Sequence, residues 1–136
     1  MIRMNTDGMR AAPEQLAEGV YRLGARRHDA KLQCNTYLIA RDGHALLIDP
    51  GPDALFPALH DALSRIIDPS AITAVAATQP SIEALSAVPR WQSAGLAAPL
   101  YGHWWTGMSV ELAGMSLETT HIHTANVGDM EIIPGV

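Results

Sequence analysis

The chain has 136 residues with a formal net charge of −5, and 48% of them are hydrophobic, which predicts one ordinary globular domain and excludes a disordered segment. The basic residues form no cluster longer than Arg26-Arg27, so we expect no nucleic-acid partner. No stretch approaches the roughly 18 consecutive apolar residues of a membrane span, and residues 1–10 lack the apolar core of a signal peptide. We therefore expect a cytoplasmic protein that does not associate with membranes.

Cys34 is the single cysteine, so no disulfide and no cysteine-based metal cage can form within one chain. A free cysteine is most often a small buried hydrophobic residue, and we assign that role to Cys34 at the start of a strand. A reactive thiol is the minor alternative.

Strand signals dominate the first third of the chain. Residues 1–17 form a polar leader, and we expect a single domain over residues 18–136 that begins with a strand at 19–25. Residues 34–52 predict two antiparallel strands, because Asp42-Gly43 supplies the positive φ angles of a type I′ turn. The second of these strands is apolar without alternation, which predicts that both of its faces are covered.

Helical spacing follows this hairpin. Asp53 begins a segment in which apolar residues recur every three or four positions as far as Ile66, which predicts one amphipathic helix. Ser81 is the expected N-cap of a second helix that runs to Gly95 and that Pro89 bends or shortens.

Further strands are expected between and after these helices. The runs at 72–78 and 99–105 predict buried strands, and the segment after residue 106 predicts short strands or hairpins. The order of these elements predicts an α/β fold with a mixed sheet and helices packed on it.

Short motifs carry a resemblance to a known family. "NTYLI" (35–39), "LIDPGP" (47–52) and "IDPSAI" (67–72) resemble the oxygen-binding diiron branch of the metallo-β-lactamase superfamily, which includes flavodiiron proteins and bacterial signalling domains. "HWWT" (103–106) is similar to a segment of the signalling members. The resemblance covers residues 18–136 and implies an αββα sandwich with a mixed sheet, of which this chain holds the N-terminal half and short C-terminal strands.

The resemblance also implies where metal ligands belong. In the superfamily a His-x-His-x-Asp-His motif, or a variant with carboxylates, follows the strand that corresponds to 73–78. Counted along this chain, the ligand positions fall on Gln79, Ser81, Glu83 and Ala84. Only Glu83 offers a good metal donor, because amide and hydroxyl oxygens are weak neutral ligands and alanine offers none. We therefore interpret the motif as degenerate and expect neither iron nor zinc at this loop.

Asp49 occupies a position that, by the same resemblance, lies beneath the metal cluster as a supporting residue. Without the ligands it has a simpler role as the cap of the following turn, which Asp before Pro-Gly performs well. Both interpretations remain open at this point.

Histidines near the C-terminus offer an alternative metal site. His121 and His123 would share one face of a strand, and Asp129 or Glu83 would complete a set of three ligands. We favour surface or hydrogen-bonded histidines, which are the more common case. His103, beside two tryptophans, is either a ligand near an oxygen pocket or a packed, hydrogen-bonded residue, and we favour the second.

The C-terminal stretch implies an incomplete sandwich. In the family the remaining ligands come from a C-terminal half, and residues 127–136 resemble the hairpin just before that part. Half a sandwich leaves an apolar sheet face open, so we expect a second copy of the chain or a complementing chain to cover it. A truncated gene is the other explanation.

The leading hypothesis is a degenerate oxygen-binding-diiron-like domain, a pseudoenzyme that acts as a non-catalytic regulatory or assembly module in a bacterial cytoplasm. The rival hypothesis is a metal-dependent hydrolase or oxidoreductase, with one iron or zinc ion held by histidines. Its candidate ligands are His103, His121, His123 and Asp129. A third possibility is half of a composite domain that has no independent role.

Overall fold

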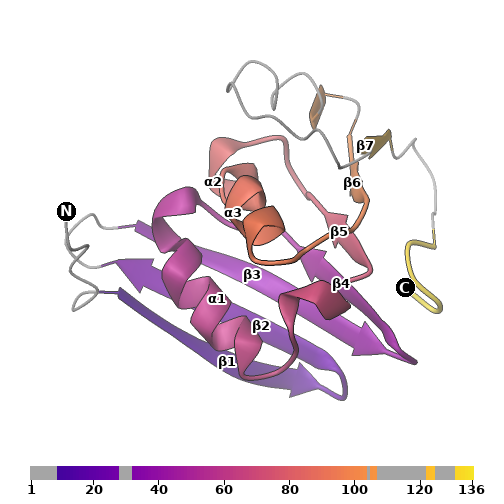
Figure 1. The fold of residues 1–136 in the computed structure, drawn as a ribbon, viewed down its shortest axis with the longest axis horizontal. Helices are drawn as coiled ribbons and strands as arrows, with labels where there is room; N and C mark the ends of the chain where they lie inside the picture. The colour runs from indigo at the N-terminus through magenta and orange to yellow at the C-terminus, as the bar shows by residue number, and fades with distance from the viewer. Residues whose placement is uncertain (1–8, 28–31, 104, 107–121, 125–130) are drawn as a thin grey trace.

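The computed structural model describes residues 9–27, 32–103, 105–106, 122–124 and 131–136. Within these residues the strands form one seven-stranded sheet in the order β1-β2-β3-β4-β5-β6-β7 (Figure 1). The strands are β1 (Met9–Ala17), β2 (Val20–Arg27), β3 (Leu32–Arg41), β4 (His44–Ile48), β5 (Ala74–Ala76), β6 (Leu100–Gly102) and β7 (Ile122–Thr124). The helices are α1 (Phe56–Ser64), α2 (Ile82–Leu85) and α3 (Val88–Ser93), with short 3₁₀ helices η1 (Asp53–Leu55) and η2 (Pro69–Ala71).

The sheet is mixed, as the sequence predicts. Strands β1 to β4 pair antiparallel with their neighbours, whereas β4 to β7 pair parallel. The hairpin turn between β3 and β4 is confirmed, because Asp42 and Gly43 have φ angles of +49° and +78° and both must be positive in a type I′ turn. The α/β fold with its mixed sheet is therefore confirmed.

The predicted polar leader is wrong from Met9 onward. Residues 9–17 form β1, which pairs with β2 from Met9 opposite Arg27 to Ala17 opposite Val20. An edge strand needs apolar residues on one face only. When the residues on that face are small or few, the sequence of the strand is polar overall and gives little strand signal. Pro13 fits this position, because proline is tolerated in edge strands.

The two predicted helices are shorter than the apolar spacing indicates. The first begins as η1 and becomes α helical only over Phe56–Ser64. The second is divided into α2 and α3, and Pro89 is the second residue of α3. Because proline lacks an N–H, it cannot sit inside one continuous helix, but it fits the first turn of a new one.

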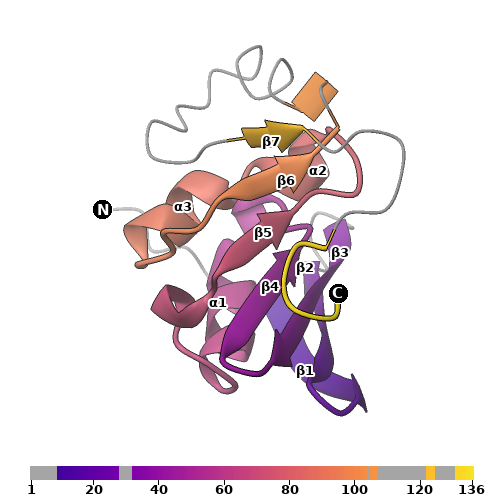
Figure 2. The same cartoon turned by 90° about the vertical axis from the view of Figure 1, so that its right-hand side faces the viewer.

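The helices pack on one face of the sheet, and the C-terminal turn packs on the other (Figure 2). Leu47 of β4 belongs to the large core beneath the helices, whereas Leu46 belongs to a smaller cluster with Ala74 and Ile133 on the opposite face. Ala45, Leu46 and Leu47 are all buried, so the prediction that this strand is covered on both faces is confirmed.

A proline-glycine turn holds the C-terminal residues against that opposite face. Val136 N–H donates to the carbonyl of Ile133 at 2.9 Å, and Gly135 between them has a φ angle of +79°. This is a type II turn, in which proline sets the first central residue and glycine allows the positive φ of the second. The turn lets Ile133, only 3% exposed, cover Leu46.

The described part of the chain contains no helix long and apolar enough to cross a membrane.

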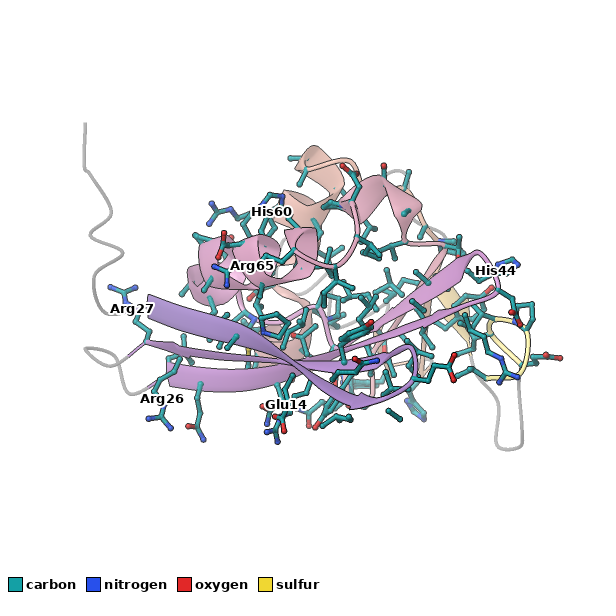
Figure 3. All side chains as sticks on the ribbon, turned by 90° about the horizontal axis from the view of Figure 1, so that it is seen from below. Glu14, Arg26, Arg27, His44, His60 and Arg65 are labelled. Carbon is teal, nitrogen blue, oxygen red and sulfur yellow. The ribbon has the colours of Figure 1, made fainter. Side chains whose placement is uncertain are left out.

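Figure 3 shows the two surfaces of the fold: His60 and Arg65 lie on the helical layer, whereas Glu14 and Arg26 project from the opposite side of the sheet.

Trp91 is the largest fully buried side chain among the described residues, and its hydrogen bond provides a test of the fold. Its Nε1–H donates to the carbonyl of Pro50 at 2.9 Å. Trp91→Phe leaves that carbonyl without its partner, so we expect a loss of about 1–3 kcal/mol in the free energy of unfolding. Urea unfolding would measure it, with Trp105→Phe, at an exposed position, as the control. Equal stabilities of the Trp91 variant and the wild type would contradict this role.

Candidate functional site

The carboxyl ends of the parallel strands meet at one edge of the sheet, where ligands bind in open α/β sheets. Asp49 follows β4, Thr78 follows β5 after one further residue, and His103 follows β6. The 79–84 segment carries the predicted ligand positions. It consists of a turn that leaves this edge at residues 79–81 and the first residues of α2 (Figure 1), and we refer to it as the 79–84 loop.

Asp49 ties the end of β4 to the end of β5. Its Oδ1 accepts a hydrogen bond from Thr78 N–H at 2.7 Å, and its Oδ2 accepts one from the Thr78 hydroxyl at 2.6 Å. Its backbone has a φ angle of +52°, a conformation that Asp tolerates better than most residues. Asp49 thus holds Thr78, the residue just before the 79–84 segment, and its carboxylate bonds Thr78 and not the turn that follows Asp49.

The hydroxyl of Ser81 stabilises the start of α2. Its hydroxyl accepts a hydrogen bond from Ala84 N–H at 3.2 Å, which makes it the predicted N-cap of α2. Such a bond satisfies one of the free amides at the start of the helix.

The other three ligand positions lie around one small cavity of about 180 Å³. Gln79 and Glu83 are exposed, whereas Ala84 is buried. The residues that line this cavity are Gln33, Cys34, Asn35, Asp49, Gly51, Gln79, Glu83 and Ala84. The structure therefore brings together four of the residues that the sequence singled out, including Asp49.

These residues do not fit a dinuclear metal centre. Two transition-metal ions need several imidazole, thiolate or carboxylate donors. This cavity offers Glu83, amides, a carboxylate already bonded to Thr78, and the Cys34 thiol, whose pKa is raised by burial so that the metal-binding thiolate is disfavoured. Within the described ranges no three His, Cys, Asp or Glu side chains are grouped so that they could hold a metal ion.

The proposed histidine site is only partly described. His103 is exposed, and its Nδ1 accepts a hydrogen bond from Trp105 N–H at 3.2 Å. His123 is in β7, where the parallel register places it opposite Tyr101 of β6. His121 and Asp129 lie outside the described residues, so their metal-binding role stays a prediction.

Cys34 borders the cavity in a partly buried position. Burial raises the pKa of its thiol, and hydrogen bonds with Thr36 and the backbone of Ala25 oppose that rise only in part. A raised pKa keeps the thiol protonated at neutral pH, and the thiolate is the reactive form. The interpretation of Cys34 as a small, partly buried hydrophobic residue agrees with this environment.

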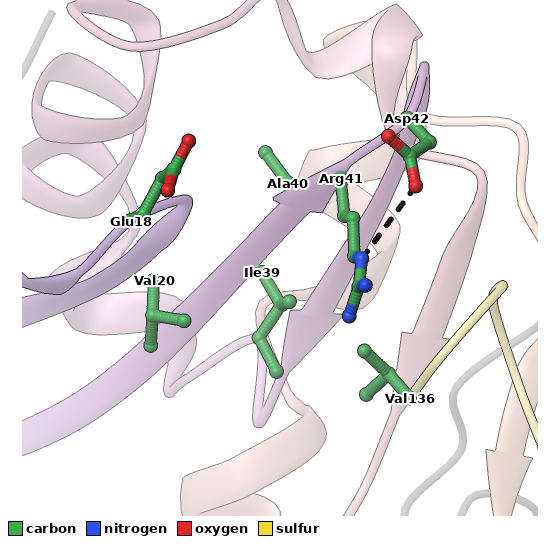
Figure 4. Close-up of a pocket in the computed structure, with 7 residues that line it drawn as sticks. All are labelled: Glu18, Val20, Ile39, Ala40, Arg41, Asp42 and Val136. Atoms are coloured by element: carbon green, nitrogen blue, oxygen red, sulfur yellow. Dashed lines mark ion pairs between the residues drawn. The ribbon is translucent and has the colours of Figure 1, made fainter.

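A larger cavity, of about 550 Å³, lies elsewhere (Figure 4). It is lined by Glu18, Val20, Ile39, Ala40, Arg41, Asp42 and Val136. The guanidinium of Arg41 lies 3.5 Å from the Asp42 carboxylate at its rim. Sequence analysis missed this cavity because it joins two turns and the C-terminal residues, and no motif marks such a meeting of distant segments. None of its charged residues, Glu18, Arg41 and Asp42, was a candidate from the sequence, and the cavity lies away from the carboxyl ends of the parallel strands, so we place the candidate site at residues 79–84.

The family now follows from comparison with known proteins. The profile of the family described as "ODP family beta lactamase" matches residues 32–133, which is most of the chain. The chain belongs to this family. No curated protein matches the sequence.

Solved structures agree with this assignment at the level of the fold. A mutant flavo di-iron protein from Thermotoga maritima aligns with a TM-score of 0.76 and 18% sequence identity. The alignment covers 93% of this chain and 35% of the flavo di-iron protein. A metallo-β-lactamase from Cronobacter sakazakii, mutated in its HARLDQ motif, aligns with a TM-score of 0.72 and 15% sequence identity. The alignment covers 87% of this chain and 48% of the lactamase. The apo chemotaxis sensor ODP from T. denticola aligns with a TM-score of 0.59 and 18% sequence identity. The alignment covers 86% of this chain and 46% of the sensor. The chain of this ODP-family protein thus spans about a third to a half of these proteins.

Replacing Asp49 tests whether its two hydrogen bonds hold the site. Asp49→Ala removes both acceptors of Thr78, so we expect a loss of about 1–3 kcal/mol in the free energy of unfolding. Asp49→Asn keeps one acceptor oxygen and tolerates a positive φ, so it should lose clearly less. Chemical denaturation compares the variants, and backbone NMR shifts of 78–84 report on the loop. Unchanged loop shifts in Asp49→Ala would contradict the anchoring role.

Proposed function

We propose that this ODP-family domain is a pseudoenzyme that binds no metal at the 79–84 loop and acts as a non-catalytic regulatory or assembly module in a bacterial cytoplasm. One observation carries the proposal. The loop is anchored by Asp49 and capped by Ser81, yet around its cavity Gln79 and Ala84 offer no metal donor of useful strength. Its shape is retained through protein hydrogen bonds, and the single remaining carboxylate, Glu83, cannot hold two cations.

A measurement of bound iron and zinc tests this proposal. Protein purified after growth with added iron should contain far less than one metal ion per chain. Gln79→His with Ala84→His places two imidazoles beside Glu83 and should raise the iron content, because three donors can then converge. Stoichiometric iron in the wild type that is lost in Glu83→Ala would contradict the proposal.

The same measurement decides the rival function. A mononuclear hydrolase or oxidoreductase is favoured by one observation: β6 and β7 are neighbours, and their register sets His123 opposite Tyr101, two residues from His103. If one iron or zinc ion were bound there, His103→Ala and His123→Ala would each remove it. Sub-stoichiometric metal that neither substitution changes would end this alternative.

The assembly role is supported by the sheet face opposite the helices. On this face Ile39, Ile48 and Tyr101 are only partly buried, packed around the Leu46 cluster. Charged residues of both signs border it, including Arg41 and Glu131. A second copy of the chain or a complementing chain would bury these apolar side chains, whose exposure to water is unfavourable.

The molecular mass in solution tests the assembly role. We expect the wild type to be a dimer, or to bind a complementing chain, and Ile39→Lys to be monomeric because it places a charge in the apolar face. Ile82→Lys, on the exposed side of α2, is the control and should leave the mass unchanged. Light scattering coupled to gel filtration gives the mass. A wild-type monomer that binds no partner chain would contradict assembly through this face.

A further inference from the structure

The alternation of side chains along β2 identifies the residues on the sheet face opposite the helices. Leu23 and Ala25 are buried in the core beneath the helices, and successive residues of a strand point to opposite faces. Arg22, Gly24 and Arg26 therefore occupy the other face, and Figure 3 shows Arg26 projecting from that side. Residues directly opposite one another on neighbouring strands share a face, with Cβ atoms about 5 Å apart. The strand register thus shows which residues adjoin Arg26.

Arg22 and Arg26 differ in what the register places beside them. Glu14 is opposite Arg22 on β1, and the two side chains form an ion pair. The positions opposite Arg26 are those of Arg10 on β1 and Gln33 on β3, so neither neighbouring strand offers an acid there. Within the described part of the chain, the side chain of Arg26 makes no ion pair or hydrogen bond. This exposed guanidinium can therefore bind an anionic ligand.

A hollow of about 210 Å³ lies beside Arg26, lined by residues 24–26 of β2 and 33–35 of β3. Gly24 contributes no side chain to it, and a glycine inside a strand often marks a place where a ligand approaches the backbone. Asn35 is directly opposite Gly24, and its Oδ1 is 3.6 Å from the position that a Cβ of residue 24 would take. The amide of Asn35 therefore borders the space that Gly24 leaves open.

Three side chains with N–H donors surround this hollow. Arg26, Gln33 and Asn35 are exposed and line it. Neither amide has a side-chain partner within the described ranges. The guanidinium carries five N–H donors and each amide carries two, and rotation of the terminal torsion of an amide brings its NH₂ group to the place of its oxygen. The hollow thus combines one positive charge with donors from two strands.

The hollow is distinct from the cavity at the 79–84 loop. Gln33 and Asn35 border both, but Arg26 lines only the hollow, whereas Asp49 and Glu83 line only the other cavity. The two carboxylates would repel an anion, and they do not line the hollow beside Arg26. A ligand of this hollow therefore differs in charge from a cation at the candidate site.

A phosphate group matches these donors better than a carboxylate does. A phosphate ester has three acceptor oxygens and a charge of about −1.5 to −2 at pH 7. Arginine binds such a group through two parallel N–H···O bonds, which leaves a third oxygen for the amides of Gln33 and Asn35. A carboxylate has two oxygens and one charge, and a bidentate guanidinium uses both oxygens. The amides therefore add more to the binding of a phosphate group.

We infer that this hollow binds a phosphate group, either as inorganic phosphate or as a small phosphate ester. The guanidinium of Arg26 bonds two of the oxygens, and the amides of Gln33 and Asn35 donate to a third. Gly24 leaves the room in which the phosphate lies against β2. None of these residues is required for the proposed absence of metal at the 79–84 loop, so the phosphate site is an additional property of the domain.

An NMR titration of the whole chain with inorganic phosphate tests this inference, with the ionic strength held constant by sodium chloride. We expect shifts at residues 24–26 and 33–35 that saturate with one site, and glycerol phosphate should shift the same residues. Acetate should bind at least about threefold more weakly, because it carries less charge and fewer oxygens. The tighter of the two phosphate compounds identifies whether free phosphate or an ester is preferred.

Two variants separate the charge of the site from its space. Arg26→Gln should weaken phosphate binding about threefold or more, since exposed charge pairs contribute modestly. Gly24→Val fills the hollow without changing any charge and should also weaken binding. Valine suits a strand, and Gly24 does not have a positive φ angle. Arg65→Gln removes the same charge from the helical layer (Figure 3) and is the control that should bind as the wild type does. The dispersion of each NMR spectrum verifies folding.

Three outcomes would each overturn the inference. They are the absence of saturable shifts at residues 24–26 and 33–35 with both phosphate compounds, equal phosphate binding by Arg26→Gln and the wild type, and acetate binding as tight as that of phosphate. Metal content is measured separately on the same protein. Failure of the phosphate site with sub-stoichiometric metal would therefore leave the proposed function intact, whereas stoichiometric iron that is lost in Glu83→Ala would refute the proposed function alone.

Discussion

The anchor between Asp49 and Thr78 is the interaction on which the rest of the site depends. One carboxylate accepts both the backbone N–H and the hydroxyl of Thr78, so the ends of β4 and β5 are fixed to each other. The carbonyl of Asp49 in turn accepts the hydroxyl of the fully buried Thr36 at 2.7 Å. The charge of Asp49 is thereby used within the protein, at the point where the site's loops begin.

Backbone hydrogen bonds extend this anchor into the loop. Gly51 N–H donates to the carbonyl of Ala84 at 2.9 Å, and Ala87 N–H donates to the carbonyl of Gly51 at 2.9 Å. Glycine is required here, because its φ angle is +92° and a Cβ would lie 2.5 Å from Leu59. Protein hydrogen bonds thus hold the 79–84 segment to its neighbours.

The sequence predicts the parts of this fold that local chemistry determines. Asp42-Gly43 can form few turns other than the one observed, and Ser81 has the chemistry of a helix cap, so both predictions are confirmed. The strand β1 was missed because an edge strand carries little apolar signal. The division of α2 from α3 was only half anticipated from Pro89, since the break also depends on the hydrogen bond between Ala87 and Gly51, which no local pattern reveals.

The site shows the same division between local and distant information. Counting along the sequence identified Gln79, Glu83 and Ala84, which border one cavity. It did not identify Gln33 and Asn35, because β3 reaches this cavity only through the sheet pairing with β4.

The ODP-family scaffold of this chain therefore carries a cavity lined by three side-chain amides, the carboxylates of Asp49 and Glu83, and the Cys34 thiol. Amides recognise polar organic molecules, whereas iron and zinc require several imidazole, thiolate or carboxylate donors. The role that we propose is regulation or assembly, in which the strand ends position contacts and perform no bond-breaking step.

Anomalous diffraction at the iron edge tests this account most directly, using crystals grown without oxygen in excess ferrous iron. The account predicts no iron peak in the cavity bordered by Gln79 and Glu83, with the Asp49 carboxylate still bonded to Thr78. A pair of iron peaks in that cavity, with Glu83 as a ligand, would contradict it.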